Sequence, residues 1–142
     1  MKNKVVGVGY EGLAPSELVE ILKREKIGLV VDVRKNAWSY DQRFRKEEMK
    51  RWLGEADIRY IHLPELGIDS SVRKVRSYMD LMTFIEDEFE VLVRKSAHKM
   101  KLLRRVAATV LKKESVALLC MESDQWRCHR KVLLKIVKTL LA

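Results

Sequence analysis

The stretch Gly28-Leu-Val-Val-Asp-Val-Arg34 decides the fold of this chain. It is short and rich in β-branched residues, and it stays apolar until its end. An uninterrupted apolar run of this length is typical of a strand that is covered on both faces, as in a parallel sheet. We therefore expect residues 28–34 to form an interior strand of an α/β domain.

Working outward, similar short segments predict three further strands, at residues 4–10, 59–64 and 115–121. Between and after them, apolar residues recur at spacings of three and four, which predicts helices over residues 15–26, 46–56, 75–93, 96–113 and 128–141. Strands that alternate with helices favour a parallel sheet. The prediction is a single α/β domain over residues 1–142, a Rossmann-like three-layer fold. Its sheet is mainly parallel, with about four strands and helices on both faces.

The composition excludes several classes of protein. With 142 residues, 47% of them hydrophobic and 35% charged, the chain is long and apolar enough for one globular domain. No apolar run is long enough to span a bilayer, and the N-terminal segment does not have the pattern of a signal peptide. The two cysteines rule out a disulfide scaffold and suit a reducing compartment. We expect a cytoplasmic protein without a membrane partner, as a monomer or small homo-oligomer.

The positive charge of the chain is concentrated near its C-terminus. Residues 1–93 carry 16 Lys and Arg against 17 Asp and Glu, whereas residues 94–142 carry 13 against 3, so the net charge of +9 arises there. Such asymmetry favours an anionic partner, either a small molecule or nucleic acid, although a solvated basic face on two helices explains it equally. The residues predicted for the nucleic-acid alternative are Lys101, Arg104, Arg105 and Lys112.

Polar side chains gather where the predicted strands end. In an open parallel sheet, ligands bind outside the carboxyl ends of the strands. The residues at these ends, and at the start of the last predicted helix, are Tyr10, Asp32, Arg34, His62, Cys120, Glu122, Cys128, His129 and Arg130. We expect them to converge on one edge of the sheet.

The chemistry of these residues suggests a role for each. Asp32 or Glu122 would act as general base or nucleophile, and His129 or His62 as proton carrier. Cys128, at a helix N-terminus that favours a thiolate, is the alternative nucleophile, and a buried inert thiol is an equal interpretation. Substrate binding would fall to Tyr10, Arg34, His62 and Arg130. Arg34 can also form a structural ion pair with Asp32, two residues away, and Arg130 can simply pack along its helix.

Several familiar chemistries fit poorly. Cysteine phosphatases need an Arg six residues after the Cys, and Trp126 stands six after Cys120. Cys120, Cys128, His129 and His62 are residue types that can bind zinc. However, Cys128 and His129 would point about 100° apart on a helix, so no metal site is predicted. A thiol redox pair is a weaker third possibility, because nothing marks Cys120 as a resolving thiol. The glycines at residues 7–12 lack the Lys-Ser/Thr of a P-loop, and the cofactor is left open.

A set of aromatic residues lies among cations in the same regions. Aromatic and cationic side chains together can stack bases while holding phosphates, although they more often anchor a loop to the core. The residues concerned are Trp38, Tyr40, Phe44 and Trp126.

Taken together, the motifs resemble the domain of unknown function 488 family of small prokaryotic proteins. The resemblance rests on Val8-Gly9-Tyr10, Asp32-Val33-Arg34, Tyr60-x-His62-Leu63-Pro64-x-Leu66-Gly67 and Cys120-x-Glu122-x5-Cys128-His129-Arg130, with Ser39 and Phe44 between them. It implies a Rossmann-like α/β fold and a set of signature residues, but no settled reaction. One departure is Ala37, where relatives commonly have proline. We therefore expect binding of, or action on, a phosphate-bearing, nucleotide-like substrate at the carboxyl edge, and leave open whether the protein is an enzyme.

Overall fold

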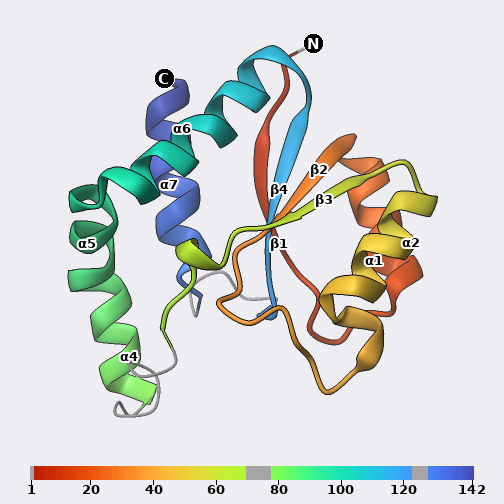
Figure 1. Cartoon of the computed structure of the whole chain (residues 1–142), viewed down its shortest axis with the longest axis horizontal. Coiled ribbons are helices and arrows are strands. Elements are labelled where there is room, and N and C mark those ends of the chain that lie inside the picture. Colours follow the sequence, from red (N-terminus) through yellow and green to blue (C-terminus); the bar gives the residue numbers. More distant parts are fainter. Residues whose placement is uncertain (1, 70–77, 123–127) are drawn as a thin grey trace.

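The computed structural model describes residues 2–69, 78–122 and 128–142 (Figure 1). Its four strands, all parallel, form one sheet in the order β1-β4-β2-β3. Their bounds are Val5–Gly9 (β1), Ile27–Asp32 (β2), Arg59–His62 (β3) and Ser115–Cys120 (β4). This confirms the predicted α/β class and the four-stranded parallel sheet. Every residue of β4 is buried, because β4 lies between β1 and β2 in the interior of the sheet.

Helices cover both faces of the sheet, as predicted. Figure 1 shows the first two helices on one side of the sheet and the remaining helices on the other. Their bounds are Pro15–Arg24 (α1), Lys46–Glu55 (α2), Tyr78–Phe84 (α4), Glu90–Lys95 (α5), Ala97–Lys112 (α6) and Arg130–Leu141 (α7). The fold therefore has three layers, with α1 and α2 opposite α6 and α7.

Each face of the sheet packs against its helices through a separate apolar core. On one face, Leu18 and Leu22 of α1 pack with Met49 and Leu53 of α2 against the sheet. On the other face, a larger cluster joins α6 and α7 to β2 and β4. Burying an aliphatic side chain of this size stabilises the fold by roughly 1.5–3 kcal/mol, so these two faces fix the position of every strand end.

Two helix predictions need correction. The helix predicted over residues 75–93 consists of α4 and α5 joined by a wider π-helical turn at Ile85–Phe89, and residues 75–77 lie outside the described ranges. The last helix begins at Arg130 instead of residue 128, with His129 as its N-cap residue. Cys128 and His129 therefore precede the helix and do not follow helical spacing. Two 3₁₀ turns, Gln42–Phe44 and Pro64–Leu66, lie within segments predicted as loops.

The topology creates a crevice at the carboxyl edge. β4 lies beside β2, but the chain leaves β2 toward α2 on one face and leaves β4 toward α7 on the other. Neighbouring parallel strands whose connections run to opposite faces open a crevice at their carboxyl ends, where such folds bind ligands. Within the described ranges, no helix has the length and apolar character needed to cross a bilayer.

Candidate functional site

A cavity of about 200 Å³ lies at this crevice. The segments after β1, β2 and β4 contribute most of its lining, and residues near Ile68 and at the start of α7 complete it. Of the predicted site residues, it brings together Tyr10, Arg34, Cys120, Glu122 and His129. The lining also includes Trp38, one of the aromatic residues that the sequence analysis considered for base stacking. The other lining residues, which are not among the predicted site residues, are Lys35, Asn36, Ile68 and Met121.

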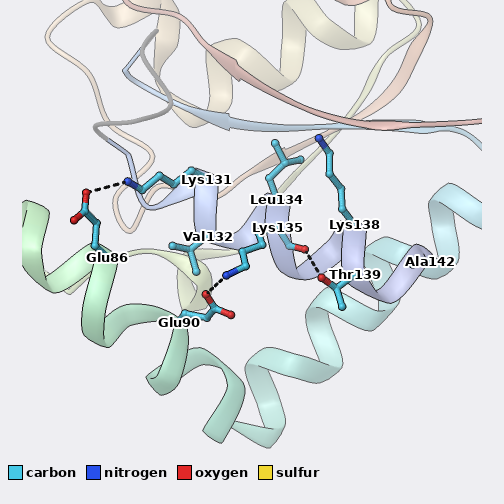
Figure 2. A pocket seen from close by; sticks show the side chains of 9 residues that line it. All are labelled: Glu86, Glu90, Lys131, Val132, Leu134, Lys135, Lys138, Thr139 and Ala142. Carbon is cyan, nitrogen blue, oxygen red and sulfur yellow. Dashed lines mark hydrogen bonds and ion pairs between the residues drawn. The ribbon is translucent and has the colours of Figure 1, made fainter.

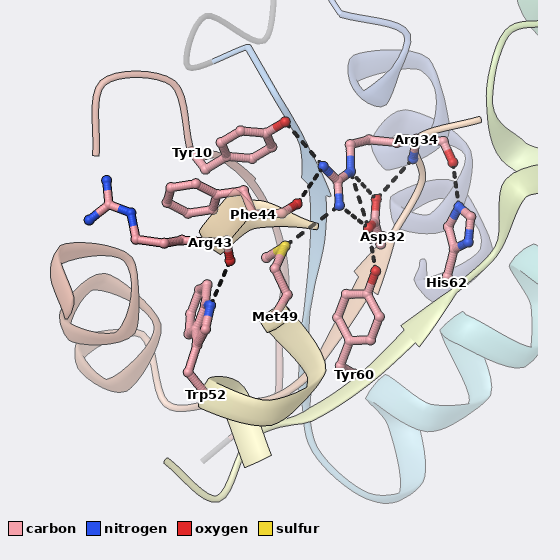
Figure 3. Close-up of polar contacts among 9 residues, drawn as sticks. All are labelled: Tyr10, Asp32, Arg34, Arg43, Phe44, Met49, Trp52, Tyr60 and His62. Carbon is pink, nitrogen blue, oxygen red and sulfur yellow. Dashed lines mark hydrogen bonds and ion pairs between the residues drawn. The ribbon is translucent and has the colours of Figure 1, made fainter. Parts of the chain in front are cut away.

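Arg34 is held in place by neighbours on every side (Figure 3). Its Nε and Nη2 donate to the Asp32 carboxylate at 2.7–3.1 Å, and Nη2 also contacts Met49 Sδ at 3.6 Å. Its Nη1 donates to Tyr10 Oη at 3.1 Å and to the Phe44 carbonyl at 2.9 Å. A guanidinium has five N–H donors. These contacts engage all five, so none remains for a bound anion.

Asp32 is enclosed by the same network. Its side chain is fully buried, and it accepts hydrogen bonds from Arg34 and from the Tyr60 hydroxyl. Burial lowers the pKa of Arg34, but the hydrogen bonds and charge of Asp32 outweigh it and hold that pKa above its usual value. Burial and then the charge of Asp32 raise the pKa of Tyr60. The geometry thus matches the structural ion pair that the sequence left open, and Asp32 lies outside the cavity lining.

Two other predicted binding residues also lie outside the lining. His62 Nε2 lies 2.7 Å from the Arg34 carbonyl oxygen, so it ties β3 to the end of β2. Arg130 is buried, packs against Gly7 of β1 and donates from Nη1 to the Val8 carbonyl. A Cβ on Gly7 would lie only 3.0 Å from Arg130 Nε, so the glycine makes room for this side chain. Arg130 therefore joins α7 to β1.

The two thiols and His129 meet at the wall of the cavity, which Cys120 and His129 line and Cys128 does not. Cys120 ends β4 and donates from Sγ to Glu122 Oε2 at 3.0 Å. Cys128 Sγ lies 3.6 Å from His129 Nδ1 and accepts from the Arg130 backbone N–H at 3.4 Å. The expectation that Cys128 and His129 diverge was wrong, because both residues precede the first turn of α7.

The close approach of the two thiols separates their pKa values. The Cys120 thiol, by hydrogen bonding, lowers the pKa of Cys128 to about 5 against the opposing effect of burial, and His129 adds to the lowering. The same pairing with Cys128, together with burial and the nearby Glu122 carboxylate, raises the pKa of Cys120. The pairing therefore favours ionisation of Cys128 over ionisation of Cys120.

The segment after β2 supplies a cavity wall of which the sequence analysis had named only Trp38. Lys35, Asn36 and Trp38 follow Arg34 directly and line the cavity. A Cβ on Gly67 would lie 2.4 Å from the Lys35 backbone nitrogen, so only glycine permits this close approach. Their position directly after a buried strand, on the edge where ligands bind, was the signal that would have identified them.

The aromatic residues divide between core and surface. Phe44 is buried and stacks on Tyr10 with ring centroids 4.5 Å apart, so it anchors its loop. Trp38 is 51% exposed, and the Arg45 guanidinium lies 4.8 Å from its ring centroid. Tyr40 is exposed and packs edge-on against Trp38, whereas Trp126 lies outside the described residues.

With this geometry in place, the comparisons with known proteins can be added. Residues 14–137 match the family model described as domain of unknown function DUF488. The chain belongs to this family. The comparisons with curated proteins and with solved structures gave no significant match. The DUF488 match includes every predicted site residue except Tyr10, which precedes it.

A larger groove of this DUF488 protein lies away from the predicted residues (Figure 2). It has a volume of about 730 Å³ and runs along α7 beside Glu86 and Glu90. Lys131 pairs with Glu86 at 3.7 Å, and Lys135 pairs with Glu90 at 2.9 Å. Because both of its carboxylates are paired with lysines and none of the predicted site residues lines the groove, the smaller cavity is the better candidate.

Proposed function

We propose that the cavity at the carboxyl edge binds the anionic end of a phosphate-bearing, nucleotide-like ligand. The observation that carries this proposal is the composition of the walls at the crevice. Lys35, Asn36 and Trp38 supply a cation, an amide and an indole on one side. Glu122 and His129 supply polar groups on the other. Such a mixture of convergent polar groups and aromatic rings is typical of small-molecule sites.

The size of the cavity limits which part of the ligand enters. Its volume of about 200 Å³ is below the roughly 300 Å³ at which pockets for whole drug-sized molecules begin. A phosphate or phosphosugar therefore fits inside, and a base would lie over the exposed ring of Trp38. Stacking of a base on such a ring contributes about 1–3 kcal/mol.

One role moves from a predicted residue to its neighbour, and another falls to the second of two predicted residues. The donors of Arg34 are engaged internally, so the cation that meets the ligand is Lys35, whose side chain is exposed. The Asp32 carboxylate is likewise enclosed and lies outside the lining, so the carboxylate that lines the cavity is that of Glu122. The proposal thus keeps the predicted edge of the sheet and reassigns its binding residue.

Thermal shift measurements with inorganic phosphate, sugar phosphates and nucleotides test the proposal. A ligand at 100 times its Kd stabilises a protein by about 2.7 kcal/mol, which is a shift of roughly 9 °C for a chain of this length. Lys35→Ala should abolish that shift. Lys50→Ala removes another exposed lysine, on α2 and outside the cavity, and should leave the shift unchanged. Absence of any shift, or equal shifts in both variants, would contradict the proposal.

The exposed face of α6 supports the alternative, a nucleic-acid-binding surface. Four of its cations are exposed, and none of these four forms an ion pair with an acidic residue within the described ranges: Lys101, Arg104, Arg105 and Lys112. Binding of oligonucleotides through four phosphate contacts would weaken with salt at a log–log slope of about −3 to −4. Charge reversal at Arg104 and Arg105 should abolish it, while Lys35→Ala should not. An interaction insensitive to salt would exclude this alternative.

A further inference from the structure

Two sulfur atoms and one imidazole nitrogen meet where β4 and the start of α7 come together. The Sγ atoms of Cys120 and Cys128 and a ring nitrogen of His129 all lie within 4.8 Å of one another. All three side chains are buried. The geometry points to a transition-metal site in which Cys120, Cys128 and His129 bind one Zn²⁺.

The measured separations are close to those that zinc requires. Zn–S bonds of about 2.3 Å and Zn–N bonds of about 2.0–2.1 Å in a tetrahedron place sulfur and nitrogen about 3.6 Å apart, and two sulfurs about 3.8 Å apart. Cys128 Sγ and His129 Nδ1 are already 3.6 Å apart. The remaining separations, of no more than 4.8 Å, need to close by about 1 Å at most.

The orientation of the His129 ring favours metal binding through Nδ1. Its Nε2 lies 3.0 Å from the Val33 carbonyl oxygen. A carbonyl can only accept, so Nε2 carries a proton, and in the neutral imidazole Nδ1 then presents its lone pair toward Cys128. Metal-binding histidines usually donate their other ring N–H to a carbonyl or carboxylate in this way. The Arg130 backbone N–H, which donates to Cys128 Sγ, would in turn stabilise a bound thiolate.

The ligand set also indicates the kind of metal and the kind of site. Two thiolates and an imidazole select zinc over magnesium or calcium, which prefer oxygen ligands. Cys120 and His129 both line the cavity, so the fourth position of the metal faces it, next to Glu122. Three protein ligands with one open position are typical of catalytic zinc. The metal site stands on these contacts alone, whether or not the cavity also takes a phosphate-bearing ligand.

Metal titration of the reduced full-length protein tests the inference directly. We expect one Zn²⁺ per chain by elemental analysis, and one Co²⁺ per chain with the intense absorption of tetrahedral, thiolate-bound cobalt. The chain has only two cysteines, so a thiolate band reports on Cys120 and Cys128 alone. No stoichiometric binding, or cobalt binding without the thiolate band, would overturn the inference.

Single substitutions then identify the ligands. Cys128→Ser and His129→Ala should weaken zinc binding by more than the roughly 10–100-fold that loss of an outer-shell partner costs. His98→Ala, which removes an exposed histidine, is the matched control and should bind as the unmodified protein does. Folded Cys128→Ser or His129→Ala protein with unchanged affinity would overturn the assignment. Where a variant fails to fold, the cobalt spectrum of the unmodified protein tests the inference: a thiolate band supports binding through the cysteines, and its absence overturns it.

Discussion

The buried ion pair between Asp32 and Arg34 makes the sharpest prediction about stability. Asp32→Asn preserves the shape of the side chain but leaves the Arg34 guanidinium buried without a counter-charge. The two side chains are 0% and 6% exposed, so water cannot replace the lost carboxylate. Removing one partner of such a pair typically costs about 3–5 kcal/mol. We expect a loss of this size in the free energy of unfolding.

The loss is large enough to measure without ambiguity. Unfolding entropy near the midpoint is about 2.1 cal/mol/K per residue, which gives about 0.3 kcal/mol/K for a chain of 142 residues. The predicted fall in Tm is therefore roughly 10–17 °C. Circular dichroism during thermal unfolding measures it, and urea titration at constant m confirms that the change is one of stability.

The chain contains its own matched control. Asp41 and Arg43 have the same spacing and nearly the same geometry, with Nη2–Oδ2 at 2.7 Å in both pairs. The Asp41 and Arg43 side chains are, however, 39% and 58% exposed, so solvent screens their charges. Asp41→Asn should lower Tm by only a small fraction of the Asp32→Asn shift. Equal shifts in the two variants would refute the argument that burial gives the Asp32–Arg34 pair its importance.

Two further predictions concern pH and backbone packing. Burial and the charge of Asp32 raise the pKa of Tyr60 in the folded protein. Above about pH 10 this tyrosine therefore ionises in the unfolded chain first, and the free energy of unfolding falls as pH rises. Tyr60→Phe should remove this fall, which urea midpoints at about pH 9 and 11 would measure. Tyr40→Phe, at an exposed ring, should retain it. Gly67→Ala drives a Cβ into the Lys35 backbone and should both lower Tm and weaken any ligand shift that depends on Lys35. Gly54→Ala, in α2 with open space around it, should instead stabilise the chain by about 0.5–1 kcal/mol.

The fold was predictable because strand and helix periods are strong local signals. Residues 28–34 and 115–121 could be recognised as interior strands, since they are apolar at consecutive positions, and the strands β2 and β4 that they form are buried almost throughout. The order of the strands was not predictable in the same way. Nothing local to β4 specifies that it lies between β1 and β2, because that choice depends on how the helix faces pack.

The site was predictable as an edge of the sheet but less so as a set of contacts. Strand ends identified Tyr10, Glu122 and His129 as cavity residues, because a parallel sheet brings them to one side. The argument from helical spacing failed at Cys128 and His129, because the predicted start of the last helix was two residues too early. With α7 starting at Arg130, Cys128 and His129 lie in the turn before it, and their side chains approach each other instead of diverging.

Asp32 and Arg34 hold the walls of the cavity in position, whereas Lys35, next to them in the sequence, is the cation proposed to meet the ligand. Asp32 fixes Arg34, and Arg34 fixes the Phe44 carbonyl and the Tyr10 hydroxyl, so the segments after β1 and β2 are joined at the back of the cavity. Lys35 follows the fixed residue directly, and its backbone is further confined by contact with Gly67. A charge that must be buried to hold a loop cannot also serve as a free anion clamp, since its donors are already engaged. Preorganisation of this kind lowers the entropic cost of binding, so the affinity of the cavity should depend on the buried pair as well as on Lys35 itself.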